Sequence, residues 1–330
     1  LTMQARGLPI AYVACLGNAA QVGLTTLAEA LLADERVTAL GLYIEGLGDA
    51  AAFAALAQTA RAAGKGIVAI KSGKTDAART AAASHTASLA GGGAASSAYL
   101  RQAGVAEVNT PAELIETLKI LNLHGHGLGK RICSLSCSGG EAGLVADIAA
   151  PFGLEFPPPS AAQSERLATI LGPLVTISNP LDYHTFIWGD GPRTTDVFTT
   201  MLAGYDAGVF IIDPPRPDRC DPASFEPALE AIVAAGKATG KPAFPVASLP
   251  ENFDESRAIA LMDQGIAPLM GLETALAALS AAQVGPAEAG WQPWTPVLRE
   301  RELQLVPEDE AKALLAQAGI AVPRGVSAPA

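Results

Sequence analysis

The chain has 330 residues, with 22 lysines and arginines against 33 aspartates and glutamates, and its formal net charge is −11. This acidic balance argues against a general nucleic-acid binder or a binder of anionic membranes, because such partners require a basic face. No apolar run approaches the roughly 20 residues of a transmembrane helix, and residues 1–10 lack the features of a secretory signal. The expected location is therefore the cytoplasm.

Short apolar runs alternate with alanine-rich stretches of helical period, a pattern typical of parallel sheets covered by helices on both faces. The pattern occurs twice, and the stretch before the first run, residues 1–7, is too short to stand as a helix. Thr110 and Pro111 support one helix start, because a capping hydroxyl precedes a proline at the first helical position. The first set predicts strands at 9–15, 37–44, 66–71 and 105–108, and helices near 22–33, 49–63, 92–103 and 110–123.

The second set follows a turn-rich segment at 124–129, in which His124 and His126 are expected to belong to a solvated linker. After a further linker at 285–296, an acidic first turn predicts a helix from 307, with a strand at 320–322. The second set predicts strands at 131–136, 207–213, 241–247 and 266–269, and helices near 139–151, 160–171, 193–203, 223–236, 252–263 and 271–283.

This organisation predicts three domains, at residues 1–126, 127–286 and 287–330. An open α/β domain normally begins with a strand, so a strand upstream of residue 1 is expected. The last forty residues stop one strand into a third unit. The chain is therefore expected to be a fragment of a longer polypeptide or one subunit of a split one.

The strongest local signal follows the predicted strand at 66–71. Lys71-Ser72-Gly73-Lys74 leads into about twenty mostly small residues with His85 in their middle. A stretch of this kind has few side chains to bury, and long loops are usually functional. The alternative is an ordinary surface histidine in a loop.

The segment 71–91 resembles the phosphohistidine loop of the NDP-forming acyl-CoA synthetases, the relatives of succinyl-CoA synthetase. It departs from that pattern at Ala87, where the family usually has glycine, and it keeps His85. The resemblance implies two flavodoxin-like, doubly wound parallel sheets in tandem, followed by the start of an ATP-grasp domain. Further matching segments lie at 16–18, 42–46, 101–105, 136–140, 179–182 and 308–323.

The resemblance also assigns roles to individual residues. His85 would carry the phosphoryl group, and imidazole suits this task because its ordinary pKa of about 6.5 leaves a neutral nucleophilic nitrogen at pH 7. Glu45, at a strand end, would hold the other ring nitrogen, although strand ends also carry plain exposed carboxylates. Ser138, Gly139 and Gly140 would bind phosphate at a helix start, although such turns also occur for packing reasons alone.

As a consequence of the resemblance, we expect an acid–thiol ligase component that interconverts acyl-CoA, NDP and phosphate with carboxylic acid, CoA and NTP. Its cofactors would be CoA, ATP or ADP with magnesium, and phosphate, bound mainly in domains outside this chain. Its partners would be a small carboxylic acid or acyl-CoA and the CoA-binding and ATP-grasp domains or subunits, and a homo-oligomer is compatible with this. The chain alone would be incomplete, and no protein-bound metal is expected.

A second interpretation is a non-catalytic binding module of the same fold that responds to acyl-CoA or nucleotide. The presence of both Glu45 and His85 counts against it, because a degenerate copy has no reason to keep the pair. Cys137 is interpreted as a small buried thiol rather than a nucleophile, because no histidine or acid is near it in sequence. Asp182 and His184 are expected to fix a loop.

Overall fold

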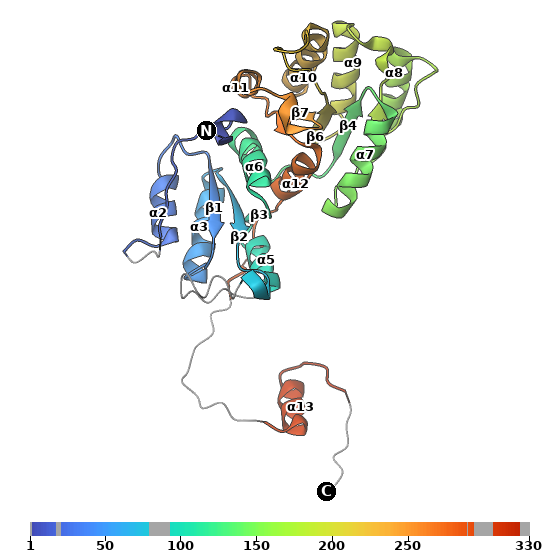
Figure 1. The fold of residues 1–330 in the computed structure, drawn as a ribbon. Helices are drawn as coiled ribbons and strands as arrows, with labels where there is room; N and C mark the ends of the chain where they lie inside the picture. Colours follow the sequence, from blue (N-terminus) through green and yellow to red (C-terminus); the bar gives the residue numbers. More distant parts are fainter. Residues whose placement is uncertain (1, 18–20, 79–92, 289, 294–305, 324–330) are drawn as a thin grey trace. The chain divides into compact units, whose positions relative to one another are not determined.

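The computed structural model describes residues 2–17, 21–78, 93–288, 290–293 and 306–323. The chain divides into two compact units, residues 1–293 and 294–330. The first unit holds two separate parallel sheets, of three and five strands (Figure 1). In the second unit the described helix is α13 (Glu308–Gln317), which follows Pro307 and carries three acidic residues in its first turn.

The first sheet has the strand order β1-β2-β3, and all its pairings are parallel. Its middle strand β2 is buried along its whole length, as expected for a strand covered on both faces. One face is covered by α2, α3 and α5 and the other by α6. The elements are α1 (Thr2–Ala5), α2 (Leu24–Leu32), β1 (Ala39–Ile44), α3 (Ala50–Ala62), β2 (Gly66–Lys71), α5 (Gly93–Gln102), β3 (Ala106–Val108) and α6 (Pro111–His124).

The second sheet has the order β5-β4-β6-β7-β8, again all parallel. This is the flavodoxin order, in which the chain crosses to the other side of its first strand after the second. The strands are β4 (Ile132–Ser136), β5 (Leu181–Asp182), β6 (Ala207–Ile211), β7 (Ala243–Ala247) and β8 (Leu269–Met270). The helices are α7 (Gly139–Ala149), α8 (Ala161–Leu171), α9 (Gly191–Leu202), α10 (Glu226–Thr239), α11 (Glu255–Asp263) and α12 (Leu272–Ala282).

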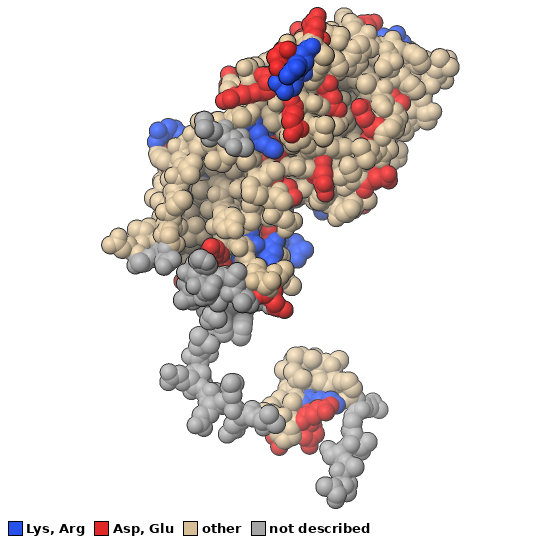
Figure 2. Space-filling model, in the orientation of Figure 1, with Lys and Arg blue, Asp and Glu red and all other residues tan. Residues whose placement is uncertain are grey.

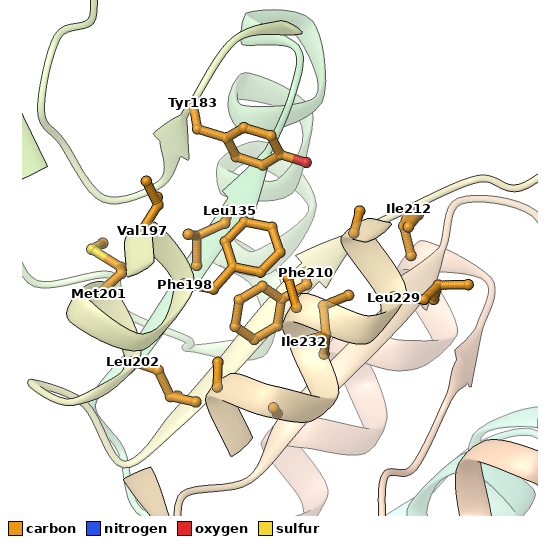
Figure 3. Packing of buried hydrophobic residues seen from close by; sticks show 14 of the residues in the cluster. Leu135, Tyr183, Val197, Phe198, Met201, Leu202, Phe210, Ile212, Leu229 and Ile232 are labelled. Carbon is orange, nitrogen blue, oxygen red and sulfur yellow. The ribbon is translucent and has the colours of Figure 1, made fainter. Parts of the chain in front are cut away.

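Two apolar layers sandwich this second sheet. On one face, strand residues such as Leu135 and Phe210 pack with α8, α9 and α10. Figure 3 shows the rings of Phe198 and Phe210 beside each other, with centroids 4.8 Å apart, and Tyr183 packs on Phe198 at 5.3 Å. The other face is covered by α7 and α12. The core therefore fixes the ends of β4, β5 and β6, where the candidate site lies.

Helix α6 joins the two sheets. It lies beside α12 (Figure 1), and its Ile120 belongs to the core of the second sheet while Leu121 belongs to that of the first. Its start is capped as predicted, since the Glu113 amide donates to Thr110 Oγ1 at 3.2 Å and Pro111 is the first helical residue. Glu116 and Lys119 of this helix are completely buried and bridge to the second sheet.

Several predicted elements differ from the structure. Residues 9–15 form no strand, because the Tyr12 hydroxyl donates to Asp34 and Arg36 lies over its ring, so the segment is held beside the end of α2. Residues 320–322 are also not a strand, since the Ile320 amide donates to the Leu315 carbonyl at 3.0 Å after the end of α13 and no described strand pairs with them. Residues 2–5 do form a short helix, and the two-residue strand β5 was not predicted.

The described part of the chain contains no helix with the length and apolar character needed to cross a bilayer. On the face shown in Figure 2, acidic side chains are spread over the half that holds the second sheet, and basic ones do not form an extended patch there. This distribution agrees with the acidic composition and gives polyanions no basic face on this side.

Candidate functional site

The carboxyl edge of the first sheet places Glu45 directly after β1, where its side chain is exposed. Lys71, the last residue of β2, lies beside it, and Lys71 Nζ donates to the main-chain carbonyl of Glu45 at 2.8 Å and to that of Ser72. The Ser72 amide in turn donates to the Ile44 carbonyl at 2.9 Å. The backbone that presents the Glu45 carboxylate is therefore held from two sides.

The segment that contains His85 leaves and re-enters the fold at this same edge. Lys74, just after β2, pairs with Glu107 of β3 at 2.9 Å. Gly93, the first residue of α5, lies so close to Lys74 that a Cβ on it would be 2.7 Å from the Lys74 carbonyl oxygen. His85 itself lies outside the described residues, so its predicted contact with Glu45 stays a prediction.

The segment Ser138-Gly139-Gly140 follows β4 and forms the N-cap and first two residues of α7, beside the point where the strand order reverses. Ligands of open α/β sheets bind in the crevice at such a switch point. The Ser136 hydroxyl donates to the Ser138 carbonyl at 2.9 Å, which closes the turn, while the Ser138 side chain does not cap α7. The first amides of α7 thus have no side-chain acceptor from the N-cap, as a phosphate cradle requires.

Three carboxylates surround this helix start, and none of them was assigned to the site from the sequence. Asp182 is the last residue of β5, Asp213 follows β6 and Glu141 is the third residue of α7. A Cβ on Gly139 would lie 3.2 Å from Asp182 Oδ2. Burial raises the pKa of the Glu141 carboxyl, and the charges of Asp213 and Asp182 raise it further. Glu141 Oε2 is buried without a hydrogen-bond partner.

These carboxylates oppose an anion electrostatically, so the turn is a weaker phosphate site than its backbone alone indicates. The described residues include no group of three or more His, Cys, Asp or Glu side chains arranged to hold a metal ion. The spacing Ser138-x-x-Glu141 is the sequence signal for Glu141, since it matches a capping box. In the structure the Ser138 side chain makes no capping bond, and Glu141 Oε2 is buried without a partner, where its charge acts on Cys137.

The structure supports the interpretation of Cys137 as a packing residue rather than a nucleophile. It is half-buried, and burial raises the pKa of its thiol, with the negative charge of Glu141 adding to the effect. A thiol that resists ionisation is a poor nucleophile. Cys137 therefore serves the packing beside α7.

The segment 179–184 holds its own loop together. The Asn179 side chain donates to the carbonyls of Ile132 and Pro157, both at 2.9 Å, and Asp182 Oδ1 accepts from the His184 amide at 2.9 Å. This agrees with the loop-fixing role expected for Asp182 and His184. It also positions Asp182 against α7.

The prediction of a solvated linker for His124 and His126 is wrong. His124 is the last residue of α6, and its ring meets Phe244 edge-on at 5.5 Å. Burial lowers its pKa to about 4. His126 Nδ1 lies 2.9 Å from Arg61 Nη1, and His126 Nε2 lies 3.0 Å from the Arg61 carbonyl oxygen. Both rings join the two sheets because the linker lies between them rather than in solvent.

Comparison with known proteins finds a matching domain family and several relatives of this chain. Residues 1–121 match the family described as succinyl-CoA ligase like flavodoxin domain. A trans-feruloyl-CoA synthase from an unidentified prokaryote is 34% identical over 198 residues, which are 60% of this chain and 28% of that protein. The ADP-forming acetate–CoA ligase of Methanocaldococcus jannaschii is 32% identical over 170 residues, 52% of this chain and 24% of the relative.

A subunit and a solved structure extend the comparison. The alpha subunit of ADP-forming acetate–CoA ligase II from Pyrococcus furiosus is 32% identical over 167 residues, 51% of this chain and 36% of that subunit. An acetyl-coenzyme A synthetase 1 of Ca. Korarchaeum cryptofilum, solved with phosphate and ADP, superposes with a TM-score of 0.67 at 25% identity. The superposition covers 81% of this chain and 57% of that one.

Residues 1–121 thus match the succinyl-CoA ligase like flavodoxin domain, and the chain is similar to NDP-forming acetyl-CoA synthetases over part of their length. The flavodoxin-like succinyl-CoA ligase fold expected from the sequence is confirmed. The chain spans between about a quarter and a third of the length of the curated relatives named above. The two candidate edges lie on different sheets of this chain, and Glu45 makes no described hydrogen bond or ion pair with Ser138.

Glu141→Gln tests whether the α7 turn is a phosphate site weakened by its carboxylates. Removing one negative charge beside the helix start should tighten the binding of inorganic phosphate at pH 7 by about tenfold, or about 1.4 kcal/mol. Isothermal titration calorimetry measures this directly, with Glu273→Gln in the first turn of α12 as a matched control. Equal phosphate affinity in both variants would show that phosphate does not bind at Ser138–Gly140.

Proposed function

We propose that this chain is the phosphoryl-carrying component of an NDP-forming acyl-CoA synthetase, with His85 as the carrier. The observation that supports this most directly is the arrangement at the first sheet. Glu45 stands at the end of β1, and the residues that flank the His85 segment, Lys74 and Gly93, meet at the same edge. Seven residues lie between His85 and Gly93, and the eight residue steps that join them span at most about 28 Å, which limits how far His85 can lie from this edge.

In the proposed reaction, a phosphate oxygen attacks the thioester carbonyl of acyl-CoA and the CoA thiolate leaves, which yields an acyl phosphate. A neutral imidazole nitrogen of His85 then attacks the phosphorus, and the bond between phosphorus and the carboxylate oxygen breaks. The proton on the other ring nitrogen is held by the Glu45 carboxylate, which fixes the tautomer and stabilises the positive ring. A β-phosphate oxygen of NDP finally takes the phosphoryl group and regenerates the imidazole.

The relatives support the substrate classes of this proposal. One is a trans-feruloyl-CoA synthase, and others are ADP-forming acetate–CoA ligases. Because the chain spans only part of each, we propose that a CoA-binding domain and an ATP-grasp domain or subunit complete the enzyme. The proposed substrates are a small carboxylic acid or its CoA thioester, with the nucleotide entering with magnesium through the ATP-grasp part.

Incubation with γ-labelled ATP and a complete ATP-grasp partner tests the carrier. The chain should gain phosphate that is labile to acid and stable to base, and His85→Ala should abolish the label. Glu45→Gln should slow labelling by more than about tenfold, because the ring loses its orienting carboxylate. His184→Ala, on the second sheet, is the matched control and should label normally. Label that survives in His85→Ala would refute the assignment.

A second function is favoured by one observation. The carboxylates of Glu141, Asp182 and Asp213 oppose phosphate at α7, which suits a non-catalytic module that binds acyl-CoA or nucleotide without relaying a phosphoryl group. In that case the wild-type chain would bind acyl-CoA but gain no label from ATP. The same labelling experiment, combined with a binding titration, separates the two functions.

A further inference from the structure

Lys71 is a buried cation at the edge that carries Glu45. Its residue is only 4% exposed, although lysines are almost never buried unless they are paired. Its ammonium donates to two main-chain carbonyls, those of Glu45 and Ser72, and forms no ion pair with a described carboxylate. The fold therefore keeps an ammonium charge in a costly place without a directly bonded anion.

Other lysines of the chain show that this arrangement is unusual. Lys119, which is equally buried, lies 2.6 Å from a carboxylate oxygen of Glu116. Lys74, three residues beyond Lys71, is paired with Glu107. The first sheet thus keeps at its carboxyl edge an ammonium whose described bonds are to carbonyls alone, whereas the second sheet gathers carboxylates at its own.

We propose that Lys71 is a positioning residue for Glu45 in the transfer of a phosphoryl group to His85, an inference that rests on the proposed function. The ammonium fixes the main chain of Glu45 through the 2.8 Å bond to its carbonyl. Its charge also acts on the Glu45 carboxylate. That positive charge offsets the repulsion between this carboxylate and an arriving phosphoryl dianion.

The proposal has a consequence for pH. The charged groups that act on Lys71 are Lys74, Glu107 and Glu45, from the end of β2, from β3 and from the end of β1. Burial and then Lys74 lower the pKa of Lys71, while Glu107 and Glu45 act in the opposite direction. Because its pKa is lowered, the Lys71 ammonium loses its proton at a lower pH than an ordinary lysine, and phosphoryl transfer should slow at alkaline pH as it does so.

The test compares Lys71→Met and Lys71→Arg with Lys65→Met in the labelling assay, from pH 5 to pH 10. Lys65 is the matched control, because it precedes the same strand and also donates to two carbonyls, those of Leu32 and Asp34, at the opposite edge. Lys71→Met should label His85 at least tenfold more slowly at pH 7. Lys71→Arg should restore the rate and keep it at alkaline pH, because a guanidinium stays charged there, and Lys65→Met should match the wild type.

A Lys71→Met chain with the wild-type rate, or with a slower rate that Lys71→Arg does not restore, would overturn the positioning role. A wild-type chain that gains no His85-dependent label would instead refute the proposed function and this inference with it. Urea unfolding checks that each variant folds. If Lys71→Met does not fold, Lys71→Gln replaces it and is expected to label as slowly.

Discussion

Replacing Glu116 with glutamine should lower the free energy of unfolding by about 3–5 kcal/mol. The Glu116 carboxylate is completely buried and accepts from Arg6 Nη1 at 2.8 Å, from Lys119 Nζ at 2.6 Å and from the Met270 amide at 3.1 Å. Glutamine keeps the shape and the bond to Met270 but removes the charge. The Lys119 ammonium would then be left in the interior with carbonyl acceptors alone.

A double variant isolates the charge effect from the packing effect. Glu116→Gln together with Lys119→Met removes both members of the buried pair and keeps an acceptor for the Met270 amide. We expect it to be clearly more stable than Glu116→Gln alone, because an uncompensated buried charge costs more than a missing pair. Urea denaturation measures all three chains. A double variant that is less stable than the single one would show that Lys119 contributes mainly through its bonds to Arg6 and Pro268.

His124 should make the fold sensitive to mild acid. Burial lowers its pKa to about 4, whereas an unfolded histidine titrates near 6.5. Below pH 6.5 His124 therefore binds a proton in the unfolded chain but not in the folded chain, and the free energy of unfolding falls as the pH decreases toward 4. The full loss is about 3 kcal/mol. The position at the end of α6, which normally favours a protonated histidine, does not compensate because Nε2 has no partner.

Urea unfolding of the wild type and of His124→Phe between pH 7 and pH 4.5 measures this effect. Phenylalanine keeps an aromatic ring against Phe244 and cannot be protonated. The difference in unfolding free energy between the two chains should change steadily in favour of the variant as the pH falls. If the unfolding free energies of the two chains change in parallel over this pH range, His124 is not the group responsible for the loss of stability in acid.

Much of the architecture was predictable because burial on both faces leaves a plain pattern in the sequence. Strand β2, with the residues Gly-Ile-Val-Ala-Ile-Lys, is apolar up to its last residue, and Thr110 with Pro111 indicates the cap of α6. Residues 9–15 are equally apolar, yet they form no strand, since a strand also needs a neighbour to pair with. No local pattern supplies that information.

The site was only partly predictable for a related reason. Glu45 and the Ser138–Gly140 turn follow strands, so a motif could place them at sheet edges. Glu141, Asp182 and Asp213 come from three different elements and meet only because β5 and β6 flank β4. The same holds for Lys71, whose burial depends on the chain around it. Proximity between distant segments is what the sequence alone does not reveal.

The close approach of Lys74 and Gly93 has a practical consequence for protein engineering. Because these two residues already touch, a short glycine bridge could replace residues 75–92 without stretching the backbone on either side. Such a shortened chain should keep the sheet registers of β1, β2 and β3 and retain Glu45 and Lys71 in place. It would serve as a scaffold without His85 onto which synthetic peptides bearing a phosphohistidine analogue could be titrated.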